Sequence, residues 1–402
     1  MPTDAPVQDE AVAVGATSEL LMSNYGPTSV RFVEGHGSWL IDSEGRRYLD
    51  LLSGLAVTSL GHSHPEVAAA ISHQASTLLH VSNLFGNDQN GPLAATIDGL
   101  LGGGGQIFFA NSGAEANECA IKLARKFGGR GRHTVVSAYG SFHGRTLATL
   151  HATGQPAKHE AFQPMPEGFR HVAWCDLDAL EVSVDDSVAA VLLEPIQGEG
   201  GVNPATEEYF AGVRTLCDER GALFMVDEIQ TGLGRTGRWF AHEHFGIRPD
   251  VVTLAKALGN GMPIGACWAR RDVATVFEPG DHGSTYGGQP LAAAAARKVL
   301  EVMQREDVPG RAERAGAALR SGLAGRADIA EIRGMGLLLG LELVAIDAKA
   351  VCAELLAQGV VVNAVTPTAI RLAPSLLITD DEISLAIAAI AAALDTVGRS
   401  AS

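Results

Sequence analysis

The sequence predicts an α/β protein with a large domain, built on a mostly parallel sheet covered by helices on both faces, and a smaller α+β domain. Between about residues 61 and 290, short apolar runs alternate with amphipathic stretches, which is typical of a mostly parallel, helix-covered sheet. After Gln289-Pro290 the pattern changes to an Ala-rich helical stretch followed by shorter strand-like and helical segments. A length of 402 residues fits two or three domains.

The N-terminal part is predicted in two pieces. Residues 1–15 start with an acidic, proline-containing stretch and are expected to be disordered. Residues 16–60 are expected to form a segment that joins the smaller domain. Within this segment, apolar residues alternate around two turn signals, Glu34–Gly37 and Asp42–Gly45, and the alternation predicts a small antiparallel β unit.

The large domain is expected to span residues 61–290, and the smaller domain residues 291–402. Apolar runs predict the strands and helical spacing of apolar residues predicts the helices. The last helix is predicted to begin at a capping box, Thr379-Asp-Asp-Glu382. The predicted strands are 106–110, 134–138, 188–194, 222–226, 251–255, 337–344, 360–363 and 370–373. The other predicted helices are 115–127, 207–220, one after Pro290, and 347–358.

Charge and composition exclude several classes of protein. A formal net charge of −16 and a pI near 5.2 argue against a nucleic-acid or anionic-membrane surface. No window approaches the ~18 apolar residues of a membrane span, and the N-terminus lacks the pattern of a signal or transit peptide. The five cysteines are widely spaced, which predicts reduced thiols in a cytoplasmic protein. No pair of histidines has metal-ligand spacing on a helix, so no metal site is predicted.

Two residues, Asp227 and Lys256, each follow a short apolar run that is predicted to be a buried parallel strand. Because the carboxyl ends of parallel strands open into one crevice, we expect these side chains to lie close together. An amine beside a carboxylate suits pyridoxal phosphate, since the amine can bind the cofactor covalently and the carboxylate can keep its ring nitrogen protonated. The alternative is that Asp227 and Lys256 form an ordinary ion pair at the edge of the sheet, which would give the same sequence pattern.

A phosphate cradle is predicted at residues 111–117. The predicted strand 106–110 ends there, a turn of small residues follows, and an amphipathic helix begins. Free N–H groups and the positive end of a helix dipole favour an anion at such a place, and Gly113 would allow close approach of the backbone. A plain strand-to-helix connection is the alternative. Gly232–Gly237 matches G-x-G-x-x-G, but it lacks the strand and helix context of a dinucleotide site.

These residues belong to a set of motifs that together resemble the class III (ω-amino) pyridoxal-phosphate-dependent aminotransferases of fold type I. The resemblance runs from about Asn24 to Pro374, and the motifs occur in the order found in that family. They are Leu60-Gly-His-Ser-His-Pro65, Asn111-Ser-Gly-Ala-Glu-Ala-Asn117, Ser141-Phe-His-Gly-Arg-Thr146, Glu194-Pro-Ile-Gln-Gly-Glu-Gly-Gly201, Asp227-Glu-Ile-Gln-Thr-Gly-Leu-Gly-Arg-Thr-Gly237, Leu254-Ala-Lys256, Gly283-Ser-Thr-Tyr-Gly-Gly288 and Arg371-Leu-Ala-Pro374.

The resemblance implies a role for each residue that would contact the cofactor ring. Lys256 would bind the cofactor covalently and then move a proton as general acid and base. Asp227 would pair with the ring nitrogen, and Gln230 would hydrogen-bond to the phenolic oxygen. Phe142 would stack on the ring, whereas an isolated phenylalanine is more often a core residue.

The resemblance also implies how the phosphate is held. Backbone N–H groups of Gly113 and Ala114 would bind it within one chain. Thr285 would reach the phosphate across a subunit interface, with Ser284 near the substrate. Active sites that are completed by a second chain predict a homodimer.

Substrate binding is implied for Arg145, Glu199 and Arg371, and also for Tyr25. Glutamate or 2-oxoglutarate brings an α-carboxylate next to the reacting carbon, and Arg371 would bind it. An ω-amine donor presents only a methylene group there, so Arg371 would need another partner; an unpaired buried guanidinium costs roughly several kcal/mol. Glu199 would supply that partner, and Arg145 would hold the distal α-carboxylate of the donor.

The donor is expected to be N2-acetyl-L-ornithine, with 2-oxoglutarate as acceptor, in a reaction of arginine biosynthesis. Aminotransferases of free ornithine carry an aromatic residue where this chain has Leu55, and the smaller side chain leaves room for an acyl group. Ornithine, 4-aminobutyrate, N-succinylornithine and N-succinyl-diaminopimelate are the alternative donors. A protein that binds pyridoxal phosphate without turnover is an alternative from another class.

Overall fold

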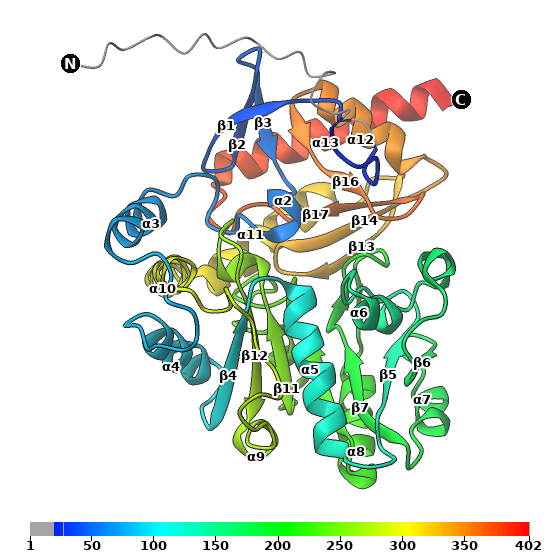
Figure 1. The fold of residues 1–402 in the computed structure, drawn as a ribbon. Coiled ribbons are helices and arrows are strands. Elements are labelled where there is room, and N and C mark those ends of the chain that lie inside the picture. Colours follow the sequence, from blue (N-terminus) through cyan, green and yellow to red (C-terminus); the bar gives the residue numbers. More distant parts are fainter. Residues whose placement is uncertain (1–19, 27, 402) are drawn as a thin grey trace, which may run out of the picture.

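The structure, a computed structural model, describes residues 20–26 and 28–401, so the expected disorder of residues 1–15 lies outside the described residues. Figure 1 shows a broad sheet with its helices in the lower part of the molecule and smaller sheets with their helices in the upper part. The N-terminal strands and the C-terminal helices lie together in the upper part. The predicted α/β class is therefore observed.

The large sheet has seven strands in the order β4-β12-β11-β10-β7-β5-β6. The neighbouring strands are parallel along the run from β11 to β6. Parallel strands direct their carboxyl ends to one edge of the sheet, and this edge faces the upper part of the molecule in Figure 1. The strands are β4 (Gly105–Ala110), β5 (Thr134–Ala138), β6 (Phe169–Val172), β7 (Val188–Leu193), β10 (Leu223–Asp227), β11 (Val251–Leu254) and β12 (Gly265–Arg270).

Strand β12 was missing from the sequence prediction, and it is antiparallel to both of its neighbours, β4 and β11. It begins Gly-Ala-Cys, and these small residues give little of the β-branched signal that indicates a strand. Gly265 is required there by close packing, because a Cβ on this residue would collide with the carbonyl oxygen of Ser112. The strand thus fixes the start of the segment predicted to cradle phosphate.

Both faces of the large sheet are covered, as predicted. Alternate residues of β10 enter different cores: Phe224 and Val226 pack in one cluster, while Leu223 and Met225 pack in another. Helix α8 contributes Phe210 and its neighbours to the first cluster, and helix α5 contributes to the second. The helices of this part are α3 (Pro65–Thr77), α4 (Asn90–Leu100), α5 (Gly113–Gly128), α6 (Leu147–Ala152), α7 (Leu177–Ser183), α8 (Glu207–Arg220), α9 (Arg271–Ala274) and α10 (Pro290–Arg305).

The upper part contains two four-stranded sheets, β1-β2-β3-β15 and β13-β14-β17-β16. The predicted strand 360–363 is wrong as one element, because the chain switches sheets within it. Val360 pairs in parallel with Leu49 of β3, whereas Asn363 pairs with Arg371 of β17. The strands are β1 (Phe32–His36), β2 (Trp39–Asp42), β3 (Arg47–Asp50), β13 (Ile329–Met335), β14 (Leu338–Leu343), β15 (Val360–Val361), β16 (Asn363–Ala364) and β17 (Ala369–Leu372).

Helices α11 (Val308–Leu323), α12 (Ala348–Ala357) and α13 (Asp380–Ala401) complete the upper part. The predicted capping box is observed before α13. The N–H of Thr379 donates to Glu382 Oε2 at 2.9 Å, and the N–H of Glu382 donates to Thr379 Oγ1 at 3.3 Å. The same glutamate accepts from Trp39 Nε1 at 2.8 Å, so the last helix is tied to the N-terminal sheet.

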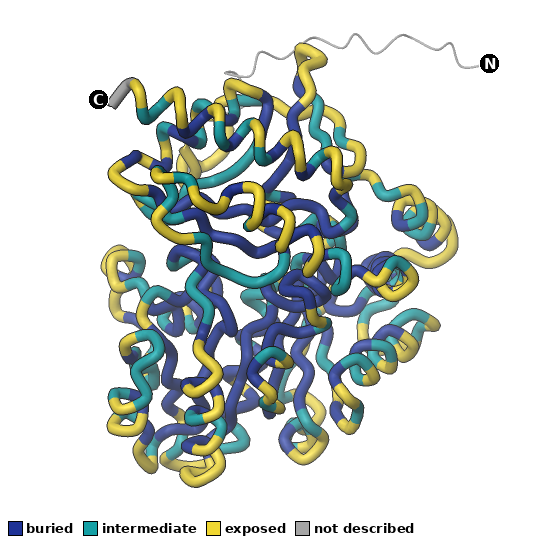
Figure 2. The backbone as a smooth tube through the Cα atoms, turned by 180° about the vertical axis from the view of Figure 1, so that it is seen from behind, coloured by how far each residue is buried: buried dark blue, intermediate teal, exposed yellow. Residues whose placement is uncertain are grey.

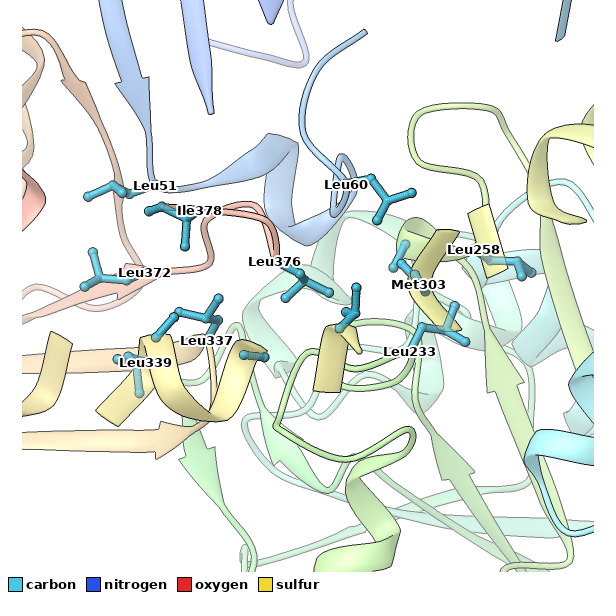
Figure 3. Packing of buried hydrophobic residues seen from close by; sticks show 14 of the residues in the cluster. Leu51, Leu60, Leu233, Leu258, Met303, Leu337, Leu339, Leu372, Leu376 and Ile378 are labelled. Atoms are coloured by element: carbon cyan, nitrogen blue, oxygen red, sulfur yellow. The ribbon is translucent and has the colours of Figure 1, made fainter. Parts of the chain in front are cut away.

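One apolar cluster joins the upper and lower parts. Leu51 from the N-terminal segment, Leu233 and Leu258 from loops of the large sheet, and Leu372 from β17 belong to it. Figure 3 shows Leu51 and Leu372 at one side of this cluster, Leu233 and Leu258 at the other, and Leu376 between them. Figure 2 shows continuous burial from the large sheet into the upper part. Large-to-small substitutions in such a core typically cost about 2–5 kcal/mol.

Candidate active site

A cavity of about 390 Å³ opens where β10 and β11 end. Asp227 is the last residue of β10, and Lys256 follows β11 in a 3₁₀ turn, Lys256–Leu258. The two predicted residues therefore line one cavity. The other lining residues are Val57, Asn111, Ser112, Gly113, Ala114, Phe142, His143, Gly144, Arg145, Glu194, Ile196, Glu199, Ile229, Gln230, Thr231, Ala255, Gly261, Met262, Pro263 and Ile264.

The N-terminus of α5 forms one wall of the cavity. Ser112 caps the helix, with its Oγ accepting from the N–H of Glu115 at 3.2 Å. Gly113 lies against Ile229, since a Cβ on the glycine would come within 2.7 Å of Ile229 Cδ1. The first N–H groups of a helix have no intrahelical acceptor. Together with the helix dipole, they give this wall the chemistry of an anion site.

Asp227 is fixed by three donors. Its Oδ2 accepts from Asn117 Nδ2 at 2.8 Å and lies 2.9 Å from His143 Nδ1, and its Oδ1 accepts from the N–H of Ile229 at 3.1 Å. Thr253 Oγ1 in turn donates to Asn117 Oδ1 at 2.7 Å. Asn117 and His143 lie inside motifs noted in the sequence, but the sequence gives no sign that both contact Asp227.

Lys256 has an environment that favours its neutral form. Burial lowers the pKa of this amine to about 8, and the positive charge of Arg371 contributes to the lowering. The carboxylates of Glu199, Asp227 and Glu194 act in the opposite direction. A neutral amine is the nucleophilic form, and with this pKa about a tenth of Lys256 is neutral at pH 7.

Arg371, on β17, is fully buried and contacts Glu199 directly, with Nη1 2.5 Å from Oε1. The same Nη1 lies 3.3 Å from Gln230 Oε1, and Nε donates to Asn363 Oδ1 at 3.2 Å. Nη2 has no acceptor within the described part of the chain. The arginine therefore keeps one buried donor group for a ligand while Glu199 neutralises its charge.

Phe142 and Glu194 also line the cavity. The N–H of Phe142 donates to Glu194 Oε2 at 3.0 Å. Burial raises the pKa of Glu194 well above its ordinary value, and the charge of Asp227 adds to this effect. Arg145 is exposed at the cavity edge, with its guanidinium carbon 5.5 Å from the centroid of the Phe142 ring.

A left-handed turn precedes Val57, which lines the cavity. Residues Ser53 to Ala56 form one left-handed turn, with φ of 71° at Leu55. This conformation costs about 1–2 kcal/mol for each non-glycine residue. Asp50 Oδ1 holds the turn by accepting from the N–H groups of Leu52 and Ser53 at 2.9 and 2.8 Å. Leu55, the predicted determinant of donor size, lies in this turn two residues before Val57 and does not itself line the cavity.

Four more predicted residues do not line the cavity of this chain: Arg371, Ser284, Thr285 and Tyr25. Arg371 contacts two lining residues, Glu199 and Gln230. Ser284 is adjacent to the cavity, because its Oγ accepts from Asn111 Nδ2 at 3.1 Å. Thr285 is exposed, and Tyr25 has 86% of its surface exposed. Exposure of Thr285 is compatible with a role at another subunit's site, and its predicted contact stays a prediction.

The residues present fit pyridoxal phosphate. Gln230 Nε2 is buried in the cavity wall without an acceptor among residues 20–26 and 28–401, so it can donate to the cofactor's phenolic oxygen. Lys256 offers the amine, Asp227 the carboxylate, and the first turn of α5 the phosphate donors. In the described ranges there is no group of three or more His, Cys, Asp or Glu side chains able to hold a metal ion. No helix there is long and apolar enough to cross a membrane.

Comparisons with known proteins give one consistent result. The family model of class-III aminotransferases matches residues 21–394. The chain is 47% identical to an acetylornithine aminotransferase of Corynebacterium efficiens over 94% of this chain and 95% of that protein. It is 48% identical to one of Mycobacterium tuberculosis, with 94% of each chain covered.

Solved structures agree. An ornithine aminotransferase of Toxoplasma gondii superposes with a TM-score of 0.91 at 37% identity, covering 96% of this chain and 95% of that one. An N-acetylornithine aminotransferase of Stenotrophomonas maltophilia gives a TM-score of 0.82 at 38% identity, covering 93% and 98%. The expected fold type I architecture and transaminase class are confirmed. On the match across residues 21–394 and on these relatives, the chain belongs to the class-III aminotransferase family.

Proposed function

We propose that this enzyme transfers the δ-amino group of N2-acetyl-L-ornithine to 2-oxoglutarate, giving N-acetyl-L-glutamate 5-semialdehyde and L-glutamate in arginine biosynthesis. The acetylornithine aminotransferases at 46–48% identity support this reaction. The observation that carries the assignment of an ω-amine donor is the buried contact between Arg371 and Glu199. A pocket that must accept an α-carboxylate in one half-reaction and a methylene group in the other needs such a removable partner.

Pyridoxal phosphate, when bound, supplies a ring that withdraws electrons from the reacting carbon. Lys256 would bind it covalently and, once released, move a proton at the reacting carbon through Nζ. Asp227 would hold the proton on the ring nitrogen, and Gln230 would donate to the phenolic oxygen. Phe142 would stack on the ring and limit its tilt.

The remaining contacts would place the cofactor phosphate and the two substrates. N–H groups of Gly113 and Ala114 would bind the phosphate at the start of α5. Arg145 would hold the distal α-carboxylate of the amine donor, since it is exposed at the cavity edge and has no hydrogen-bond or ion-pair partner in the part of the chain described. Arg371 would bind the α-carboxylate of glutamate or 2-oxoglutarate when Glu199 leaves it.

We also propose a cytoplasmic homodimer in which Thr285 and Ser284 of one chain approach the site of the other. Large apolar side chains near this segment support the proposal, since Leu84, Phe85 and Tyr286 are exposed in a single chain. Tyr25 is exposed in the same way and would contact substrate only if a second chain or the substrate covers it. The division into an N-terminal segment, residues 61–290 and residues 291–402 is kept as part of this proposal.

Free ornithine is the second candidate donor, because an ornithine aminotransferase gives the TM-score of 0.91. The two donors differ only in the acyl group on the α-nitrogen. The decisive experiment measures initial rates of the purified enzyme with N2-acetylornithine, ornithine, 4-aminobutyrate, N-succinylornithine and N-succinyl-diaminopimelate, each with 2-oxoglutarate. We expect the highest kcat/KM for N2-acetylornithine. A higher value for another donor would move the proposed function to that donor, and no turnover with any donor would indicate binding without catalysis.

A further inference from the structure

Lys158 lies beside Phe142, one of the residues that line the cavity, and has no role in the reaction described so far. Its Nζ is 5.4 Å from the centroid of the Phe142 ring, next to Arg145 over the same ring. Within the described chain, this amine donates one hydrogen bond, to Gln155 Oε1. Gln155 is itself anchored, because its Nε2 donates to the carbonyl oxygen of Ser141 at 2.9 Å. Lys158 is therefore tied to the segment that carries Phe142.

The segment that carries Glu199 packs directly against this part of the chain. Gln197 Nε2 donates to the carbonyl oxygen of Tyr139 at 3.0 Å. A Cβ on Gly200 would lie only 2.9 Å from the carbonyl oxygen of Gly140, so the two backbones are in close contact. Glu199 and Phe142 line the same cavity. Glu199 therefore contacts Arg371 directly and shares the cavity wall with Phe142, the ring that Lys158 Nζ approaches.

The charges of Lys158 and Glu199 affect each other. Burial lowers the pKa of Lys158, the positive charge of Arg145 lowers it further, and Glu199 works to raise it. Burial works to raise the pKa of Glu199, but Arg371, Lys256 and Lys158 bring it below its ordinary value. The positive charge of Arg145 therefore disfavours the charged form of Lys158. The carboxylate of Glu199 favours that form, but it is paired with Arg371.

When Glu199 leaves Arg371, its carboxylate needs another cation as a partner. When a substrate α-carboxylate binds Arg371, Glu199 must leave it, and only 33% of the Glu199 side chain is exposed. A carboxylate that is largely shielded from water and unpaired is strongly disfavoured. Arg145 is expected to be occupied by the distal carboxylate of the donor, whereas Lys158 has two N–H groups without an acceptor in the chain as described.

We propose that Lys158 is the second partner of Glu199, so that the carboxylate pairs with Arg371 in the amine-donor half-reaction and with Lys158 in the dicarboxylate half-reaction. This inference rests on the proposed function, because the exchange is needed only if one pocket serves both kinds of substrate. Lys158 acts through Glu199 and is a positioning residue. It sets how readily Arg371 becomes free for an incoming α-carboxylate.

The first test compares half-reactions of the holoenzyme in single-turnover experiments with glutamate and with N2-acetylornithine. We expect Lys158→Met to lower kcat/KM for glutamate about tenfold and to change the value for N2-acetylornithine by less than about twofold. Lys158→Arg restores most of the glutamate rate, because it keeps the charge. Lys349→Met is the matched control, since Lys349 is exposed on α12, and it should change neither rate.

The second test measures binding without turnover. Glutarate has two carboxylates and no amino group, so its affinity for the holoenzyme reports how easily Arg371 is released. We expect Lys158→Met to weaken glutarate binding about tenfold by calorimetry. In a Glu199→Ala background the same substitution should have no further effect on glutarate affinity, because the carboxylate that Lys158 would receive is gone.

Three results would overturn the proposal. Equal losses for glutamate and N2-acetylornithine in Lys158→Met would show that Lys158 only supports Phe142. A loss confined to N2-acetylornithine would show that Lys158 binds the donor's carboxylate together with Arg145. Additive effects of Lys158→Met and Glu199→Ala on glutarate binding would show that the two residues act independently. If the wild-type enzyme reacts with glutamate but not with N2-acetylornithine, the proposed donor fails, and the glutarate experiment still decides the role of Lys158.

Discussion

In the wall of the cavity, Nδ1 of His143 lies 2.9 Å from Oδ2 of Asp227, while Nε2 of the same buried ring has no acceptor among the residues that the structure describes. A proton on Nε2 would be a buried donor without a partner, which is costly. The tautomer with its proton on Nδ1 donates to the carboxylate and leaves Nε2 unprotonated. His143 therefore donates a directed hydrogen bond to Asp227 and leaves the carboxylate free to hold the proton of the cofactor ring.

Replacing His143 by Ala should remove this donor and loosen Asp227. A hydrogen bond to a charged group contributes about 1.5–3 kcal/mol, so kcat should fall roughly 10- to 100-fold and affinity for pyridoxal phosphate should also decrease. Steady-state kinetics and cofactor titration by absorbance would measure both. Asp227→Asn serves as the reference and should lose more activity, because a neutral amide cannot hold the ring nitrogen protonated. A kcat within twofold of wild type in His143→Ala would contradict this role.

Lys256→Ala should abolish transamination, by at least about a thousandfold, and leave the protein folded. The lysine supplies the covalent bond and the moving proton, whereas phosphate and ring contacts come from α5, Phe142 and Gln230. Pyridoxal phosphate should therefore still bind, without a covalent link, in equilibrium dialysis. Turnover within tenfold of wild type in the purified variant would show that the assignment of Lys256 is wrong.

The lowered pKa of Lys256, about 8, predicts a pH dependence for capture of the cofactor by apoenzyme. Neutral amine is the reacting form, so the rate of covalent capture should rise about tenfold per pH unit below 8 and level off above it. The pKa of Lys256 is lower in the folded protein than in the unfolded chain. The free energy of unfolding contributed by this group therefore increases as the pH rises from about 8 to the pKa of the unfolded chain. Stopped-flow absorbance between pH 6 and 10 would test the rate, with Lys256→Ala as the control lacking the covalent phase. A rate that climbs steadily to pH 10 would exclude the lowered pKa.

Glu199→Ala should change the ratio of the two half-reactions. Arg371 would stay unpaired when the amine donor binds, so efficiency with N2-acetylornithine should fall while the glutamate half-reaction is kept or improved. The change in ratio should correspond to about 1–3 kcal/mol, the effect of removing one member of a charge-assisted pair. Single-turnover rates with each donor would measure it, and the exposed Glu181→Ala is the control. Equal losses with both donors would mean that Glu199 does not control Arg371.

Site residues at or directly after the ends of predicted strands could be predicted from the sequence. Asp227 and Lys256 are adjacent because β10 and β11 are parallel neighbours, and Gly113 opens α5 where a strand-turn-helix pattern indicated it. The roles of Arg371 and Glu199 came from resemblance to a family, and the structure shows them in contact.

The remaining contacts depend on tertiary packing, which no local pattern encodes. Asn117 and His143 reach Asp227 from α5 and from the segment after β5, and Asn363 reaches Arg371 from β16. Strand β12 was missed because small residues carry little strand signal. The predicted contact of Thr285 is with a second chain and that of Tyr25 is with substrate, so both stay predictions, as do the domain boundaries.

The parallel pairing of Leu49 in β3 with Val360 in β15 has a consequence for synthesis of the protein. β3 is made early and β15 is made near the end of the chain, so the β15 side of β3 has no partner strand until residues 360 and 361 have been made. Exposed edges of this kind are sites of association between chains. Completion of the N-terminal sheet is therefore one of the last events in production of the enzyme, and nascent chains that stall before residue 360 would present an aggregation-prone edge to the cell's quality control.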